Sequence, residues 1–129
     1  MKKLTLILFT FFLFMTSSMM AADVPYFKTG NELFDECREV LKQENKTDVV
    51  TGNCIGFIEG AADTHETLVD SLYIKPIFCL QQNVQSEQLV RIVLKSLAEH
   101  PELLNAPASH LVLNSLKEAF PCPESQPSK

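Results

Sequence analysis

Thirteen consecutive residues, CIGFIEGAADTHE at positions 54–66, contain side chains that could do chemistry. A cysteine beside a basic histidine can act as a nucleophile, and a group of cysteine, histidine and carboxylate side chains can hold a metal ion. The side chains concerned are Cys54, Glu59, Asp63, His65 and Glu66. What they can do depends on the element that positions them.

The pattern around this stretch predicts a helix over residues 51–71, and a helix separates the reactive side chains. Cys54 and His65 are eleven residues apart, which is roughly 16 Å along a helix axis. His100 and His110 could approach the cysteine only from another helix. The sequence after His65 lacks the second histidine of the zinc-protease helix, and no phosphate-binding glycine motif follows a strand. We therefore expect no catalytic residue, no metal site and no cofactor.

Two glycines, Gly56 and Gly60, lie four residues apart on this predicted helix and share one of its faces. Glycine inside a helix costs about 1 kcal/mol relative to alanine. We expect another helix or backbone segment to pack closely against this face. A groove that binds a ligand along the backbone is the alternative.

Four carboxylates on the same predicted helix are spaced three to four residues apart and form an acidic stripe. Such a stripe is either a solvated face or a docking surface for a basic partner. Its members are Glu59, Asp63, Glu66 and Asp70.

The N-terminus has the layout of a secretory signal peptide. Lys2 and Lys3 precede an apolar run, and small residues then lead to the first acid, Asp23. The apolar run is shorter than the roughly 20 residues that a membrane span needs, although the uncharged stretch 4–22 leaves an uncleaved anchor as the alternative. We expect a signal peptide at 1–22, export to a bacterial periplasm, and no membrane attachment after cleavage.

The remaining chain of about 107 residues is long enough for one domain with a modest core. Without Lys2 and Lys3 it has nine basic and 16 acidic residues, a net charge of −7. An acidic chain is unsuited to nucleic acid, whose binding depends on neutralising phosphates. Its charge favours a cationic partner.

Apolar residues recur at helical spacing in four segments, and no segment of real length alternates in the manner of a strand. Thr29 and Glu32 form a capping-box pattern before the first helix, and Ser86 can cap the third. We predict an all-α domain at 23–122, a small bundle of four main helices in antiparallel hairpins, followed by a flexible tail at 123–129.

All four cysteines follow the predicted signal peptide, and an even number in a small exported chain indicates disulfides. Cys79 precedes the third helix and Cys122 follows the fourth, and these ends are neighbours in an antiparallel hairpin. Cys37 lies on the first helix and Cys54 near the start of the second, across a short connection. We predict the pairs 37–54 and 79–122, which stabilise by roughly 3 and 4 kcal/mol on the chain-entropy model.

These residues carry a resemblance to a known family. The helix CIGFIEGAAD, with the later segments FCL, QLV, LAEHPE, AS and LKEAFPC, resembles the Rap/Tai immunity proteins of type VI secretion systems over about residues 30–122. The resemblance implies a small helical periplasmic protein, often a homodimer, that binds and blocks a peptidoglycan amidase delivered by neighbouring cells. Such an effector is a papain-like cysteine hydrolase, and occluding its cleft requires no chemistry from the immunity protein.

The resemblance also suggests that a loop near the C-terminal helices enters the enzyme cleft, and the best candidate is HPELLNAP at 100–107. Prolines on both flanks stiffen this segment, and two leucines at its tip could fill a pocket. Both leucines could instead fold back over the third and fourth helices. The partner-binding candidates in the segment are His100, Glu102, Leu103 and Leu104.

The function predicted from the sequence is therefore immunity against a secreted peptidoglycan amidase, which protects the producing cell and its siblings. The alternative is an envelope binding protein or holdase without a dedicated toxin partner, which would protect several unrelated clients. An enzyme would need a free thiol or a metal.

The cysteine pattern makes a direct prediction about thiols. Denatured but unreduced protein should give essentially no reaction in a thiol titration, because both pairs are oxidised. Peptide mapping by mass should recover the 37–54 and 79–122 links. One or more free thiols would contradict the disulfide framework, whereas different links would contradict only the placement of the helices.

Overall fold

In the computed structural model, the described residues are 26–40, 42 and 49–123. The predicted signal peptide, 1–22, lies outside them, as does the tail from residue 124 onward. The polar segment 43–48 between the first two helices is also outside the described residues.

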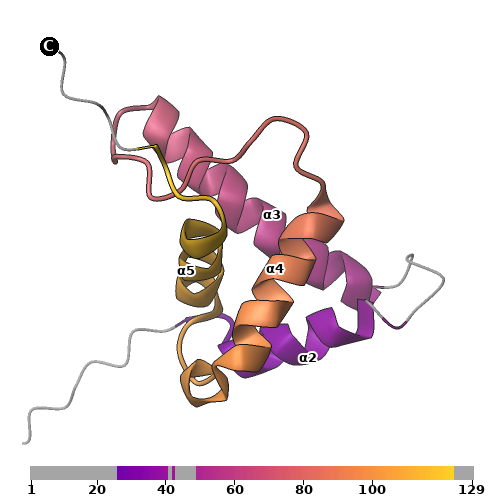
Figure 1. Ribbon diagram of the computed structural model, residues 1–129. Coiled ribbons are helices and arrows are strands. Elements are labelled where there is room, and N and C mark those ends of the chain that lie inside the picture. The colour runs from indigo at the N-terminus through magenta and orange to yellow at the C-terminus, as the bar shows by residue number, and fades with distance from the viewer. Residues whose placement is uncertain (1–25, 41, 43–48, 124–129) are drawn as a thin grey trace, which may run out of the picture.

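Within the described part of the chain, the fold consists of four α-helices and one short 3-10 turn (Figure 1). The elements are α2 (Gly30–Val40), α3 (Val49–Asp70), α4 (Ser86–Glu99), the 3-10 turn η1 (Pro101–Leu103) and α5 (Ala108–Ala119). Helix α2 packs against α3, and α4 packs against α5. The prediction of a small all-α bundle is confirmed.

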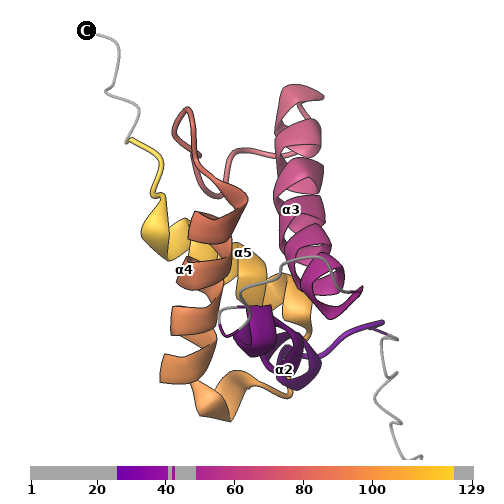
Figure 2. The same cartoon turned by 90° about the vertical axis from the view of Figure 1, so that its right-hand side faces the viewer.

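Helix α3 is the longest element and contacts the other three helices. Figure 2 shows it upright along one side of the molecule, with α4 and α5 beside one of its faces. The inner face carries Cys54, Ile58, Ala62 and His65, which are all buried and are spaced three to four residues apart. The core therefore lies between α3 and the other helices, and includes Leu33, Val90, Val93, Val112 and Leu116.

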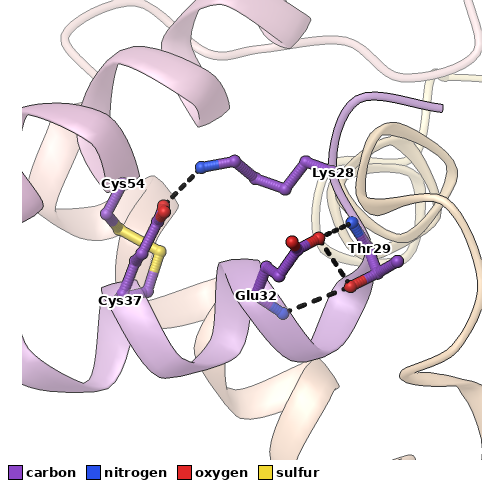
Figure 3. Close-up of polar contacts among 6 residues, drawn as sticks. Lys28, Thr29, Glu32, Cys37 and Cys54 are labelled. Carbon is purple, nitrogen blue, oxygen red and sulfur yellow. Dashed lines mark hydrogen bonds and ion pairs between the residues drawn. A yellow bond between two sulfur atoms is a disulfide. The ribbon is translucent and has the colours of Figure 1, made fainter.

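Both predicted disulfides are present, and each fixes a different junction. Cys37–Cys54 joins α2 to α3 with a Cα–Cα distance of 5.1 Å, and both side chains are fully buried (Figure 3). Cys79–Cys122 joins the segment after α3 to the end of α5, with a Cα–Cα distance of 4.8 Å. Every cysteine of the chain is therefore in a disulfide.

The predicted capping box at the start of α2 is also present (Figure 3). Thr29 donates its backbone N–H to the Glu32 carboxylate at 2.8 Å and its hydroxyl at 2.9 Å, while the Glu32 N–H donates to that hydroxyl at 3.4 Å. The backbone bond, followed by the hydroxyl bond, holds the pKa of Glu32 below its usual value. Beside the cap, Lys28 pairs with Glu36 and lies 5.4 Å from the centroid of the Phe57 ring on α3.

The prediction that Ser86 caps the third helix is wrong. Ser86 is the first residue of α4, and Gln85 occupies the cap position without a side-chain bond to the helix. The Ser86 hydroxyl instead donates to the carboxylate of Glu59 on α3. A hydrogen bond to an ionised carboxylate is stronger than a neutral cap bond, which explains why the hydroxyl turns toward α3.

The predicted close packing at Gly56 and Gly60 is not formed within the subunit. Both residues are exposed, and a Cβ atom added to either would meet no atom within 4 Å. They lie away from the buried face of α3 that carries Ile58. Gly30 is the glycine at which a side chain does not fit, because a Cβ atom there would lie 2.9 Å from the carbonyl oxygen of Leu104.

Alanine in place of Gly56 or Gly60 should therefore stabilise the subunit. Each replacement removes the helix cost of glycine, which is at most about 1 kcal/mol, and adds a methyl group in open space. Denaturant unfolding at low protein concentration measures the change. Gly30→Ala is the matched control and should destabilise by about 1–3 kcal/mol. A loss of stability at position 56 or 60 comparable to that at 30 would contradict the open arrangement.

Candidate partner-binding surface

The predicted acidic stripe of α3 is divided between two roles. The carboxylate of Glu59 is bonded to α4, and Oε1 of Glu66 lies 3.2 Å from Nδ1 of His65. Both carboxylates thus have a partner inside the fold, although the Glu66 side chain is still 45% exposed. Asp63 and Asp70 are exposed, so an outside partner can reach these two carboxylates as well as that of Glu66.

The segment 100–107 is bonded along the start of α2. The Gly30 N–H donates to the Ala106 carbonyl at 2.9 Å, and the Asn31 N–H donates to the Leu104 carbonyl at 2.8 Å. These bonds satisfy amides at the N-terminal end of α2, which have no partner inside that helix. The segment therefore holds the start of α2 in place.

The two leucines of this segment have different environments. Leu104 packs against the core, as the fold-back alternative predicted, whereas Leu103 is 46% exposed. His100 and Glu102 lie on the surface, with 3.3 Å between Nδ1 of His100 and Oε1 of Glu102. His100, Leu103 and Lys117 share the lining of a pocket of about 250 Å³ between α4, η1 and α5. The expected pair of exposed leucine anchors is not formed.

A different segment exposes a cluster of large apolar side chains. We name residues 72–77, which follow α3, the apolar loop. Leu72 is 91% exposed and Tyr73 is 79% exposed, and Ile74 and Ile77 are also exposed. In Figure 1 the chain leaves α3 at the end of that helix farthest from α2. No other described segment of this length exposes four large apolar side chains, and a cluster of this kind marks an interaction surface.

The apolar loop begins with a strained residue. Leu72 has a φ angle of +60°, in the left-handed region, which costs a residue with a side chain roughly 1–2 kcal/mol. Its N–H donates to the Val69 carbonyl at 2.9 Å, and the Tyr73 N–H donates to the Leu68 carbonyl at 3.0 Å. This pair of bonds is the Schellman termination, in which glycine is the usual left-handed residue. An almost fully exposed leucine at this position does not favour stability, which indicates a role outside the fold.

The other end of the apolar loop is fixed to the core. The Ile77 N–H donates to Nε2 of His65 at 2.9 Å. The next residue, Phe78, is 1% exposed, and its ring stacks on His65 with 3.9 Å between centroids. The Cys79 N–H then donates to the Phe120 carbonyl at 2.9 Å, beside the second disulfide. The exposed apolar side chains thus stand between two fixed ends.

A shallow apolar groove of about 380 Å³ lies between α3 and α5. Gly56, Gly60 and Ala61 line it from α3, together with Phe57, and Leu113 lines it from α5. Because the two glycines carry no side chain, the groove reaches the backbone of α3. Of the two arrangements considered from the sequence, the structure therefore contains the groove and not the close helix contact.

The sequence pattern gave no prediction for the apolar loop, which lies between the second and third predicted helices. A signal was present in Leu72, Tyr73 and Ile74, which follow the end of a predicted helix and precede a proline. Large apolar residues at a turn are either folded inward or displayed. Periodicity does not distinguish these outcomes, because a turn has no repeating face.

The described surface offers apolar side chains and charge rather than a group of reactive side chains. They contain no group of three or more His, Cys, Asp and Glu side chains that could hold a metal ion. None of the helices in that part of the chain is both long and apolar enough to cross a membrane. What the surface offers is apolar area, shape and charge, which are the properties of a protein-binding surface.

Two helical hairpins held by two disulfides, with an exposed apolar loop at one end, describe a small binding protein. Residues 29–122 match the family model of the Rap1a immunity proteins. The match includes every described helix, and the chain belongs to this family. It is thus an immunity protein directed against a secreted effector, as the sequence resemblance predicted. Curated proteins and solved structures gave no match to the chain.

Proposed function

We propose that the protein neutralises a secreted peptidoglycan amidase in the periplasm by inserting the apolar loop into the cleft of the enzyme. The observation that carries this proposal is a segment with four exposed large apolar side chains and two fixed ends. The loop replaces 100–107 as the inhibitory element, because that segment is bonded to α2. The partner class, a papain-like cysteine hydrolase delivered by a type VI secretion system, follows from the family resemblance.

The physical properties of the apolar loop suit it to a cleft. Burying its side chains is favourable by about 25 cal/mol for each Å² of apolar surface. A loop that already has its bound shape loses little conformational entropy on binding. The hydrogen bonds at Leu72, Tyr73 and Ile77 restrict the conformation of the loop before the partner binds. The strain at Leu72 is part of the folding free energy, so it does not weaken binding.

The exposed carboxylates of α3 would guide a cationic partner to the loop. Asp70 is the last residue of α3 and precedes Leu72 by two positions, and Asp63 lies two turns earlier on the helix. Charge complementarity of this kind raises the association rate more than the affinity. We infer that the effector has a basic surface beside its cleft, and that salt slows the association.

The proposed location is the periplasm. Structural disulfides form and persist in oxidising compartments, and the N-terminal pattern predicts export. An immunity protein in the periplasm meets the amidase where the cell-wall substrate lies. Blocking the cleft needs no catalytic group, metal or cofactor from the protein, so its role is to bind and not to catalyse.

Replacing Leu72 with glycine should separate binding from stability. Leu72→Gly removes an exposed anchor and relieves the left-handed strain. The affinity for the amidase should fall by about tenfold or more, while the free energy of unfolding stays the same or rises by up to about 1 kcal/mol. Calorimetric titration against a cognate amidase effector gives the affinity, and denaturant unfolding gives the stability.

Two further variants serve as controls for the loop. Phe27→Ser removes a fully exposed aromatic ring from the segment before α2 and should bind normally. Leu103→Ser tests the segment proposed from the sequence. Normal binding by folded Leu72→Gly and Tyr73→Ser proteins would refute the loop as the inhibitory element. Protection of several unrelated aggregating proteins by the parent, without amidase binding, would favour the holdase alternative.

We further propose that two copies of the chain associate through the groove between α3 and α5. A two-fold contact presents the same groove from both copies, and Gly56 and Gly60 allow the two α3 helices to approach closely. An antiparallel arrangement brings Asp63 of each copy toward the N-terminal half of the opposing helix.

Filling the groove should produce a monomer. Gly60→Leu places a side chain where the single subunit has open space, so the variant should fold, but the side chain occupies the room that the second copy requires. Sedimentation velocity over a range of concentrations measures the oligomeric state. Ala98→Leu, an equally bulky change at an exposed position of α4, is the matched control and should remain a dimer. A monomeric parent would contradict the proposed dimer and leave the inhibitory loop unaffected.

A further inference from the structure

His65 is a buried histidine with a partner at each ring nitrogen. It lies on the inner face of α3 and is 3% exposed. Nε2 accepts the hydrogen bond of the Ile77 N–H at 2.9 Å, and Nδ1 lies 3.2 Å from Oε1 of Glu66. An ionised carboxylate can only accept, so Nδ1 carries the proton and Nε2 is free of one. The two neighbours thereby fix one neutral tautomer of the ring.

The bond from Ile77 connects this buried ring to the exposed loop. Ile77 is the last residue of the apolar loop and its side chain is exposed, whereas Phe78 is buried against the same imidazole. The backbone between these two residues passes from the surface into the core. Nε2 of His65 therefore determines where the apolar loop leaves the core.

We propose that His65 is the positioning residue of the apolar loop: its Nε2 acceptor holds the loop in the shape that binds the partner. This inference rests on the proposed role of the loop in binding. A side chain without an acceptor at position 65 would leave the N–H of Ile77 without this bond, so the last residue of the loop would lose its anchor.

The contacts around the ring separate the loop from the helix. On α3 the charged group in contact with the ring is the Glu66 carboxylate, which lies beside Nδ1 and not beside the loop. The segment packed against the ring presents the amide of Ile77 and the ring of Phe78, and its charged residue, Lys75, is exposed. The bond at Nε2 is therefore the polar contact between the ring and the apolar loop.

Amide hydrogen exchange at Ile77 tests this anchor without any partner. His65→Leu keeps an apolar side chain but has no acceptor, and His65→Gln offers an oxygen that can accept the same bond and does not titrate. The protection factor of the Ile77 amide should fall about tenfold in His65→Leu and be retained in His65→Gln. The Cys79 amide, which is bonded to Phe120, is the internal reference and should not change.

Affinity for the amidase gives a second measurement. It should fall in His65→Leu, which has no acceptor for the Ile77 amide, and be retained in His65→Gln. Equal Ile77 protection in the parent and in folded His65→Leu overturns the inference.

The two readouts separate this inference from the proposed function. If Ile77 protection responds as expected while Leu72→Gly does not alter amidase binding, the role of the loop in binding is overturned and its anchoring by His65 is confirmed. If Leu72→Gly abolishes binding while the protection factor of the Ile77 amide is the same in every variant of residue 65, the loop is the inhibitory element and His65 does not position it.

Discussion

The Cys37–Cys54 disulfide is the constraint on which the rest of the structure depends. A domain of this size buries a limited apolar area, and a fully buried covalent bond within the core adds to the packing that holds α2 against α3. With α2 fixed, its free N-terminal amides are satisfied by the segment that precedes α5. That segment in turn sets the start of α5. The position of three helices thus follows from one buried bond.

Helix α3 divides the molecule into an inner structural side and an outer side that is open to solvent. On the inner side, apolar residues and one histidine form the wall of the core, and the histidine is tolerated there because both of its nitrogens are satisfied. On the outer side, Gly56 and Gly60 leave the backbone of the helix accessible, and the exposed carboxylates of Asp63 and Asp70 carry negative charge. One helix therefore contributes both to the stability of the domain and to the surfaces that we assign to binding.

Most of the architecture could be predicted from the sequence because it depends on periodicity and on helix ends. The four helices, the capping box of Thr29 and Glu32, and both disulfide pairs follow from those signals. The errors have a common physical origin. The spacing of Gly56 and Gly60 shows that they share a face, but not whether another element covers it. Likewise, Ser86 is a suitable cap by residue type, and the nearby carboxylate on α3 that captures its hydroxyl is visible only in three dimensions.

The candidate binding surface was harder to predict for a related reason. The prolines that flank 100–107 indicate stiffness but not the direction of the carbonyl groups, and it is the carbonyls of Leu104 and Ala106 that bind the segment to α2. The left-handed conformation of Leu72 is equally hidden, because leucine gives no signal for it. Both features are set by hydrogen bonds between distant or irregular backbone segments, which a pattern of side-chain types does not encode.

The independence of the apolar loop from the core has an evolutionary consequence. None of the side chains at positions 72–77 belongs to the hydrophobic core, and the loop is fixed through residues on either side of it and through backbone groups. Substitutions in these six positions can therefore accumulate with little penalty to folding, in the way that hypervariable loops diversify on a constant antibody framework. A lineage that encounters a toxin with an altered cleft can adapt by substitutions in one short stretch of codons, while the sequence of the scaffold stays the same.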